Sequence, residues 1–79
     1  MPRELWKTRV VVDPGVHHGE PCIRGTRVPV ATIVGSLADG MAAEDVLHEY
    51  PQLSREDILA ALEYAAEVLH HEALVPFAS

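Results

Sequence analysis

The sequence predicts a mostly α-helical domain that begins with a short β-rich segment. Residues 1–28 concentrate β-branched and turn-forming residues, with short apolar runs beside glycine and proline. Residues 29–72 instead carry apolar side chains at spacings of three and four, interrupted by Gly40 and Pro51. Because no internal repeat or low-complexity segment is visible, all 79 residues are interpreted as one domain: an extended part, a helical part and a tail at 73–79.

The extended part is predicted to hold a strand and a small hairpin. Residues 8–13 are rich in β-branched side chains and are followed by a Pro-Gly pair that favours a turn. Residues 22–30 place two apolar runs on either side of Gly25, where glycine permits a tight reversal. Alternation along this segment puts Ile23 inward and Arg24 outward.

Two short helices are predicted next. Pro29 is favoured at the first position of a helix, and Gly40 is suited to end that helix in a left-handed conformation. The second helix extends from about residue 42 to Tyr50, because Pro51 prevents its continuation. The residues expected to face inward are Ile33, Val34 and Leu37 in the first helix, and Val46 and Leu47 in the second.

The third predicted helix has the clearest signals. Ser54 is a good N-cap, and Asp57 three residues later resembles the second member of a capping box. The helix continues to about Glu72, before the aperiodic tail. The apolar residues expected on its inward face are Ile58, Leu62, Ala65 and Leu69, with Leu59 and Ala66 widening the stripe.

The second and third predicted helices flank the short turn PQLS, which suits a helix-turn-helix unit. The complete prediction is therefore a three-helix helix-turn-helix bundle, homeodomain-like or winged-helix-like, preceded by a short N-terminal strand and a small β-hairpin.

The charge distribution limits the classes of partner. The formal net charge is −6, but residues 1–28 carry five basic and three acidic side chains, whereas residues 29–79 carry one basic and nine acidic ones. A strongly basic nucleic-acid binder has the opposite overall balance. Contacts with phosphate would therefore have to come from the first part of the chain, or from two copies of it.

Membrane, secreted, metal-binding and catalytic classes have little support. The chain lacks the run of about 18 apolar residues that a membrane helix needs, and its N-terminus lacks the apolar core of a secretory signal. Cys22 is the single cysteine, which excludes an internal disulfide and favours a reducing cytoplasm.

His17, His18 and Cys22 could suggest a metal site or a Cys-His pair, but zinc needs three or four ligands at reproducible spacing. A domain this small also has little room for a substrate cleft. The histidines are expected to face solvent, and we expect no metal, no cofactor and no enzymatic activity.

Several linked motifs carry a resemblance to a known family. They are Gly19 with Pro21, residues 23–27 (IRGTR), Gly40, residues 50–54 (YPQLS) and Ile58. Over about residues 12–66 this arrangement resembles the bacterial and archaeal family called domain of unknown function 433. The chain departs from the family at Met41 and Ala42, where a Ser or Thr is common, so a weaker helix cap is expected there.

The resemblance implies a small helix-turn-helix antitoxin of a toxin–antitoxin system, whose partner is a PIN-like ribonuclease toxin. PIN-type sites hold divalent metal with clustered acids, and an arginine can occupy such a site as a competing cation. The candidates for this role are Arg24, Arg27 and N-terminal bases such as Arg9. Alternatively, Thr26 and Arg27 brace the turn, with Arg27 paired to an acid of the helical part.

Large apolar residues outside the periodic core also indicate a protein partner. Trp6 and the tail residues Leu74, Val75 and Phe77 are candidate anchors, although Trp6 and Phe77 could instead pack on their own domain. The strand at residues 8–13 would be an exposed edge, and antiparallel pairing of two copies would give a homodimer.

The alternative function is a stand-alone DNA-binding regulator, and an antitoxin could also bind its own operator DNA. In helix-turn-helix proteins the start of the second helix enters the major groove. Here that start reads SRED, in which one base beside two acids is a poor surface for phosphate. The candidate DNA-binding residues are Gln52, Ser54 and Arg55, with Arg24 and Arg27 from the extended part.

Overall fold

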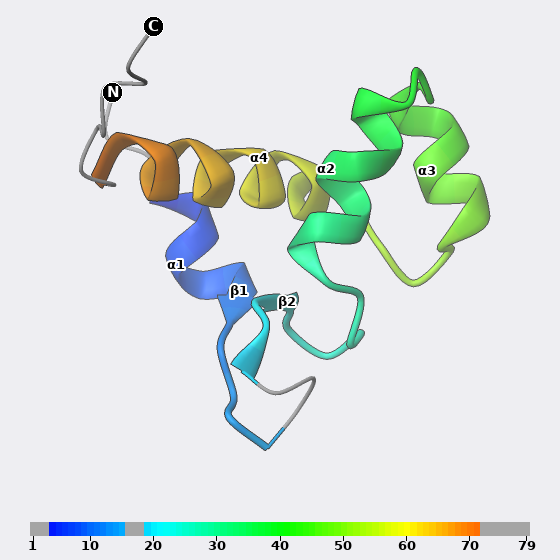
Figure 1. The fold of residues 1–79 in the computed structure, drawn as a ribbon. Coiled ribbons are helices and arrows are strands. Elements are labelled where there is room, and N and C mark those ends of the chain that lie inside the picture. Colours follow the sequence, from blue (N-terminus) through cyan, green and yellow to red (C-terminus); the bar gives the residue numbers. More distant parts are fainter. Residues whose placement is uncertain (1–3, 16–18, 72–79) are drawn as a thin grey trace, which may run out of the picture.

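The computed structural model describes residues 4–15 and 19–71 (Figure 1). Its elements are α1 (Leu5–Arg9), β1 (Val10–Val11), β2 (Cys22–Ile23), α2 (Val30–Ala38), α3 (Ala43–Glu49) and α4 (Arg55–His71). The long helix α4 packs against α1 and α2, and α3 lies at the end of the molecule opposite α1 (Figure 1). The predicted class, mostly helical with a short N-terminal β-hairpin, is confirmed. None of these helices is both long and apolar enough to cross a membrane.

Helix α1 includes residues 8 and 9, the first two of the strand predicted at residues 8–13, and this part of the prediction is wrong. The chain is helical through Arg9, and only Val10 and Val11 are extended. A five-residue helix is marginal by itself, but α4 stabilises this one: the backbone N–H of Trp6 donates to Glu63 Oε1 at 3.1 Å. The Trp6 ring also meets Tyr64 edge-on, with 5.3 Å between the ring centroids. Tertiary contacts therefore outweigh the β propensity of this segment.

The two-stranded sheet pairs residues that are far apart in the sequence. Val10 lies opposite Ile23 and Val11 opposite Cys22, in antiparallel register. Beyond β2 the chain reverses as predicted, with Gly25 at φ +79° and the Ile23 N–H donating to the Val28 carbonyl at 2.9 Å. Strand β2 thus lies between β1 and the segment that leads into α2.

Helices α2 and α3 have nearly the predicted bounds. Pro29 is the N-cap of α2, one residue outside the predicted position, and Gly40 follows the helix at φ +97°. At the start of α3, Ala42 has no side chain that could cap the helix. The Asp45 carboxylate still accepts the Ala42 N–H at 3.0 Å, so half of a capping box is present.

Helix α4 begins with the predicted capping box. Ser54 Oγ accepts the Asp57 N–H at 3.3 Å, and Asp57 Oδ2 accepts the Ser54 N–H at 2.9 Å. The helix is described to His71. The core that it helps to form comprises Val10, Ile23, Val28, Val30, Ile33, Val46, Leu53, Ile58, Ala60 and Ala61.

The predicted inward stripe of α4 is wrong in its orientation. Ile58 is buried, but Leu59, Leu62 and Leu69 are exposed, and the buried face is made instead by Asp57, Ile58, Ala60 and Ala61. The alanines at 60 and 61 are fully buried, which lets α1 and α2 approach α4 closely. The larger leucines are therefore left on the outer side of the helix.

Candidate functional site

The turn between β2 and α2 presents Arg27 on the surface. Arg27 has φ +60°, a left-handed conformation that costs a residue other than glycine about 1–2 kcal/mol. Thr26 stabilises the turn, because its hydroxyl donates to the Ile23 carbonyl at 2.9 Å and accepts the Val28 N–H at 3.0 Å. The prediction that Thr26 braces this turn is confirmed, and the bracing holds Arg27 in its strained conformation.

Arg27 also differs from the other cations of the described segments. They are engaged: Lys7 with Glu4 (3.4 Å), Arg9 with Asp57 (2.9 Å), Arg55 with Glu44 (2.6 Å), and Arg24 Nε with the Thr8 carbonyl (3.0 Å). Arg27 makes no ion pair or side-chain hydrogen bond with any residue in 4–15 or 19–71. The alternative prediction, an ion pair between Arg27 and an acid of the helical part, is therefore not found there.

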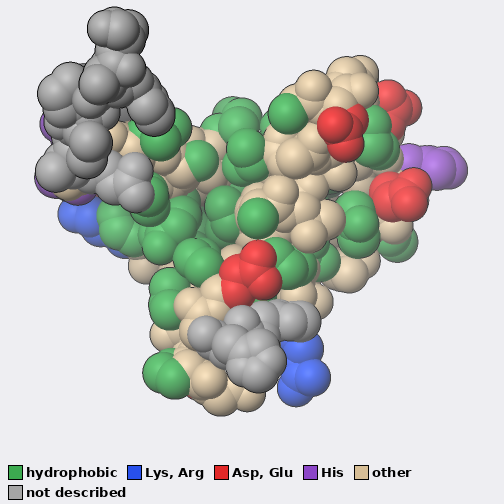
Figure 2. Space-filling model, in the orientation of Figure 1, with side chains coloured by type: hydrophobic (Ala, Val, Ile, Leu, Met, Phe, Trp, Pro, Cys, Tyr) green, Lys and Arg blue, Asp and Glu red, His purple; other side chains and the backbone are tan. Residues whose placement is uncertain are grey.

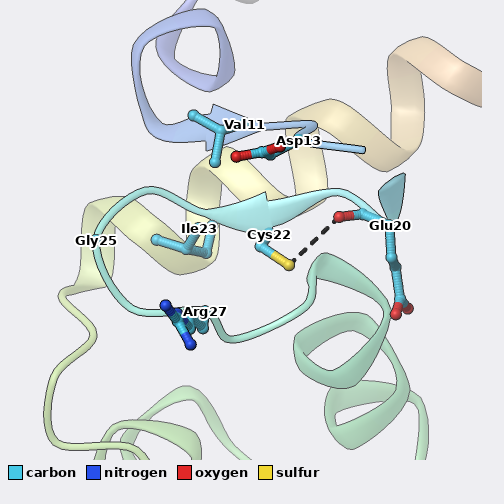
Figure 3. A pocket seen from close by; sticks show the side chains of 7 residues that line it. All are labelled: Val11, Asp13, Glu20, Cys22, Ile23, Gly25 and Arg27. Atoms are coloured by element: carbon cyan, nitrogen blue, oxygen red, sulfur yellow. Dashed lines mark hydrogen bonds between the residues drawn. The ribbon is translucent and has the colours of Figure 1, made fainter. Parts of the chain in front are cut away.

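Beside this turn lies a hollow of about 230 Å³ (Figure 3). Cys22 and Ile23 come from β2. Arg27 lies on one side of this strand and Asp13 on the other, and Glu20 lies just before the strand begins (Figure 3). Small-molecule pockets usually have volumes of about 300–1,000 Å³, so this hollow lies below their range. The turn is better suited to contact a large partner than to enclose a small ligand.

Cys22 is buried beside the hollow, with 3% of its surface exposed. Its thiol donates to the Glu20 carbonyl at 3.3 Å. Burial raises the pKa of the Cys22 thiol, and the negative charge of Glu20 raises this pKa further. The protonated thiol is therefore the favoured form at neutral pH, and it is a poor nucleophile.

We expect Cys22 to react with iodoacetamide at least about tenfold more slowly in the native protein than in the denatured one. Because its pKa is raised, the native rate should still increase at a pH where the rate of the denatured protein has reached its plateau. Mass spectrometry of samples quenched over time measures both rates, and the single cysteine makes the assignment unambiguous. Equal rates in the two states would contradict this expectation.

The start of α4 brings together the three residues predicted to contact DNA from the helical part. Gln52 is exposed, Ser54 caps the helix, and the Arg55 guanidinium bonds to Glu44 Oε1 at 2.6 Å. The hydrogen bond from Arg55 is the main cause of a lowered pKa at Glu44. Arg55 is thus already neutralised by an acid of α3.

Arg24 lies near the start of α4. Arg24, Arg9, Thr8 and Asp57 line a common surface hollow of about 250 Å³. Arg9 NH1 donates to Asp57 Oδ1 at 2.9 Å and lies 3.5 Å from Ser54 Oγ. The side chains of Arg9 and Asp57 are 37% and 11% exposed, so this ion pair is partly shielded from water. It connects the first helix to the cap of the last.

Of the predicted partner-binding residues, Arg9 and Trp6 are engaged within the domain and the other three lie outside the described residues. Arg9 forms the ion pair above, and Trp6 packs on its own domain, with its indole Nε1 buried and unbonded within the described segments. Leu74, Val75 and Phe77 lie outside the described residues, as do His17 and His18. Among the residues that are described, no cluster of three potential metal ligands is found.

An apolar groove between α2 and α4 was not anticipated from the sequence. It has a volume of about 340 Å³, and Figure 2 shows hydrophobic side chains gathered across this part of the surface. The groove is lined by Pro21, Val30, Ala31, Val34, Tyr64, Ala65, Val68 and Leu69, with Glu20 beside them. Ala65 and Leu69 of α4 are the signal that could have revealed this groove, but their spacing of four residues equally suits an inward stripe.

Comparisons with known proteins agree with the fold. An uncharacterised protein of Sinorhizobium fredii is 41% identical over 56 residues, which are 71% of this chain and 25% of that protein. The chain thus spans about a quarter of the length of this curated relative. A crystal structure of a DUF433 member protein from Anabaena variabilis has a TM-score of 0.74 and 31% sequence identity, covering 89% of this chain and 79% of the other.

Residues 10–65 match the family described as protein of unknown function (DUF433). This segment includes β1, the turn that presents Arg27, and most of α4. With more than half of the chain matched, and with a solved member of the same fold, the chain belongs to the DUF433 family.

Proposed function

We propose that the protein is an antitoxin that binds and inhibits a PIN-like ribonuclease. The observation that carries the proposal is Arg27: an exposed guanidinium in a strained backbone conformation, without an ion pair in the described segments. Strained residues concentrate at functional sites, where the surrounding structure holds them in place. Here the hydroxyl of Thr26 helps to hold the turn.

The chemistry of the proposed contact follows from the guanidinium. Arginine remains charged at all relevant pH values and offers a planar set of donors that can bond both oxygens of a carboxylate. A PIN-type site, whose clustered acids hold a divalent metal, would offer several such carboxylates. Arg27 would bind these acids and thereby oppose metal binding, and the braced turn would lower the entropic cost of ordering the contact.

A DNA-binding regulator, as a function in its own right, has weaker support. At the start of α4, Arg55 is paired with Glu44, and Glu56 adds a further negative charge. Phosphate binding depends on cations that are free to replace counterions. Operator binding would therefore depend on Arg24 and Arg27 of the extended part. Dimerisation through the N-terminal strand also has limited support, because only Val10 and Val11 form that strand.

The proposal predicts that Arg27→Asn weakens inhibition of the ribonuclease encoded in the adjacent reading frame by at least about tenfold, since removing one member of a desolvated charge pair costs about 2–5 kcal/mol. Asparagine tolerates the left-handed region, so the fold should be retained. Inhibition is measured as RNA cleavage by the purified ribonuclease at increasing concentrations of each variant, and folding by circular dichroism.

Arg55→Ala is the matched control, because it removes an exposed guanidinium that is already paired with Glu44. It should inhibit as the wild type does. A neighbouring gene product without ribonuclease activity would contradict the proposed function. Undiminished inhibition by Arg27→Asn would remove Arg27 from the contact.

A further inference from the structure

The hairpin places two arginines opposite each other. The Arg24 N–H donates to the Arg9 carbonyl at 2.7 Å, which continues the antiparallel β1–β2 register by one residue pair. Both arginines line the surface hollow of about 250 Å³ that they share with Thr8 and Asp57. Like charges directly opposite each other in such a pairing are destabilising, and an anion between them relieves the repulsion. We propose that this hollow, the Arg9–Arg24 hollow, binds one phosphate dianion, either inorganic phosphate or a phosphomonoester.

Arg24 is held in place without being neutralised. Its Nε donates to the Thr8 carbonyl at 3.0 Å, and this acceptor carries no charge. The exposed Arg24 side chain forms no ion pair with any residue in 4–15 or 19–71. Its two Nη atoms are therefore left as donors for a ligand. The bond to Thr8 also orders the guanidinium in advance, which lowers the entropic cost of binding.

The acid of the hollow has both carboxylate oxygens engaged. Asp57 Oδ1 accepts from Arg9 Nη1 and Asp57 Oδ2 accepts the Ser54 N–H, each at 2.9 Å. Within the described segments the other nitrogens of Arg9, Nε and Nη2, have no acceptor. Two arginines and one aspartate give the hollow a net charge of +1, which attracts an anion.

The arrangement of the two guanidinium groups favours a tetrahedral anion over a planar one. A carboxylate is planar, and a single guanidinium can bond both of its oxygens. A phosphate group has at least three strong acceptor oxygens and a higher charge. Arg9, at the end of α1, and Arg24, directly after β2, can therefore bond different oxygens of one phosphate. The hollow is smaller than the roughly 300–1,000 Å³ of most ligand pockets, which suits a single phosphate group.

The surroundings disfavour a nucleic-acid strand as the source of the phosphate. Glu56 is exposed at the start of α4, and Glu44 is bonded to Arg55 there. A strand would bring further phosphates towards these acids and towards a chain with a net charge of −6, whereas a single phosphate group would not. This inference goes beyond the proposed function, because Arg27 does not line the hollow.

The test follows the arginine Nε–H signals by NMR while inorganic phosphate is added to the full-length protein at constant ionic strength. We expect the signals of Arg9 and Arg24 to shift and to saturate at millimolar phosphate. Acetate is the control ligand, and it should bind at least about tenfold more weakly, because it is planar and carries a single charge.

The variant Arg24→Gln should weaken phosphate binding by at least about tenfold, because it removes the charge that no acid compensates. Arg24 is exposed, so the fold should be retained, and circular dichroism checks this. Arg55→Gln is the matched control: it removes an exposed arginine at the start of α4 but outside the hollow, and binding should be unchanged. If Arg24→Gln does not fold, the wild-type signals decide, and shifts confined to Arg27 or Arg55 would overturn the proposal.

Three further results would overturn it: no saturable shift, equal binding of acetate, or phosphate binding that Arg24→Gln retains. Duplex DNA that competes with phosphate for the wild type would assign the hollow to a nucleic-acid backbone instead. Tighter binding of a short phosphoserine peptide than of inorganic phosphate would support the proposal with a phosphorylated side chain as the source, and the reverse would support it with free phosphate. Arg27→Asn should bind phosphate as the wild type does, so failure of either proposal leaves the other testable.

Discussion

Replacing Asp57 by alanine is expected to lower the free energy of unfolding by about 2–3 kcal/mol, the sum of a lost helix cap and a lost charged hydrogen bond. The Asp57 carboxylate accepts the Ser54 N–H at the start of α4 and the Arg9 guanidinium from the end of α1. The variant would leave the Arg9 charge without its partner. Because the Arg9 side chain is 37% exposed, water compensates part of this loss, which places the expected value well below that of a fully buried pair.

Asp45→Ala is the matched control for this prediction. Asp45 makes the equivalent bond at the start of α3, to the Ala42 N–H, but forms no ion pair with a described residue and is exposed. Its replacement should cost about 0.5–1 kcal/mol. Urea unfolding monitored by circular dichroism measures both variants. If the two losses are equal, the Arg9–Asp57 pair contributes nothing to stability.

Replacing Ile58 by alanine is expected to destabilise the protein by about 2–4 kcal/mol, because the variant leaves a cavity in the core. Ile58 is 4% exposed and packs within the buried cluster. A loss of this size is a large part of the roughly 5–15 kcal/mol that stabilises an ordinary domain. The same unfolding experiment measures it.

Leu62→Ala on the same helix is the comparison that tests the orientation of α4. Leu62 belongs to the same predicted stripe as Ile58 but is 41% exposed, so its replacement should change stability by no more than about 0.5 kcal/mol. A loss as large as that of Ile58→Ala would mean that the Leu62 side chain is covered in solution. If that loss grows with protein concentration, the cover is a second copy of the chain.

Local signals in the chain were sufficient to predict much of the secondary structure. Pro29 and Gly40 delimit α2, and Ser54 with Asp57 opens α4, because helix ends are set by backbone geometry and hydrogen bonds within a few residues. The reversal at Gly25 has the same local character, since a positive φ is readily available to glycine. The residues of the turn that presents Arg27 can therefore be identified from the sequence.

The remaining features depend on contacts between distant parts of the chain. Residues 8–9 are helical because Trp6, just before them, packs on Tyr64 and bonds to Glu63, and no local pattern encodes that contact. The same holds for the side of α4 that is buried. Both possible apolar faces have helical spacing, and the close approach of α1 and α2 to Ala60 and Ala61 selects one of them.

One physical reason separates the features that can be predicted from the sequence from those that depend on the tertiary structure. Caps, turns and helix periods minimise the free energy of short segments, so they can be recognised in the order of residues. The Arg9–Asp57 pair joins residues 48 positions apart, and it forms because packing brings the end of α1 to the start of α4. The same packing engages Arg9 internally, leaves Arg27 exposed on its turn, and turns the leucines of α4 towards solvent. These assignments follow from which surfaces the folded chain buries against one another.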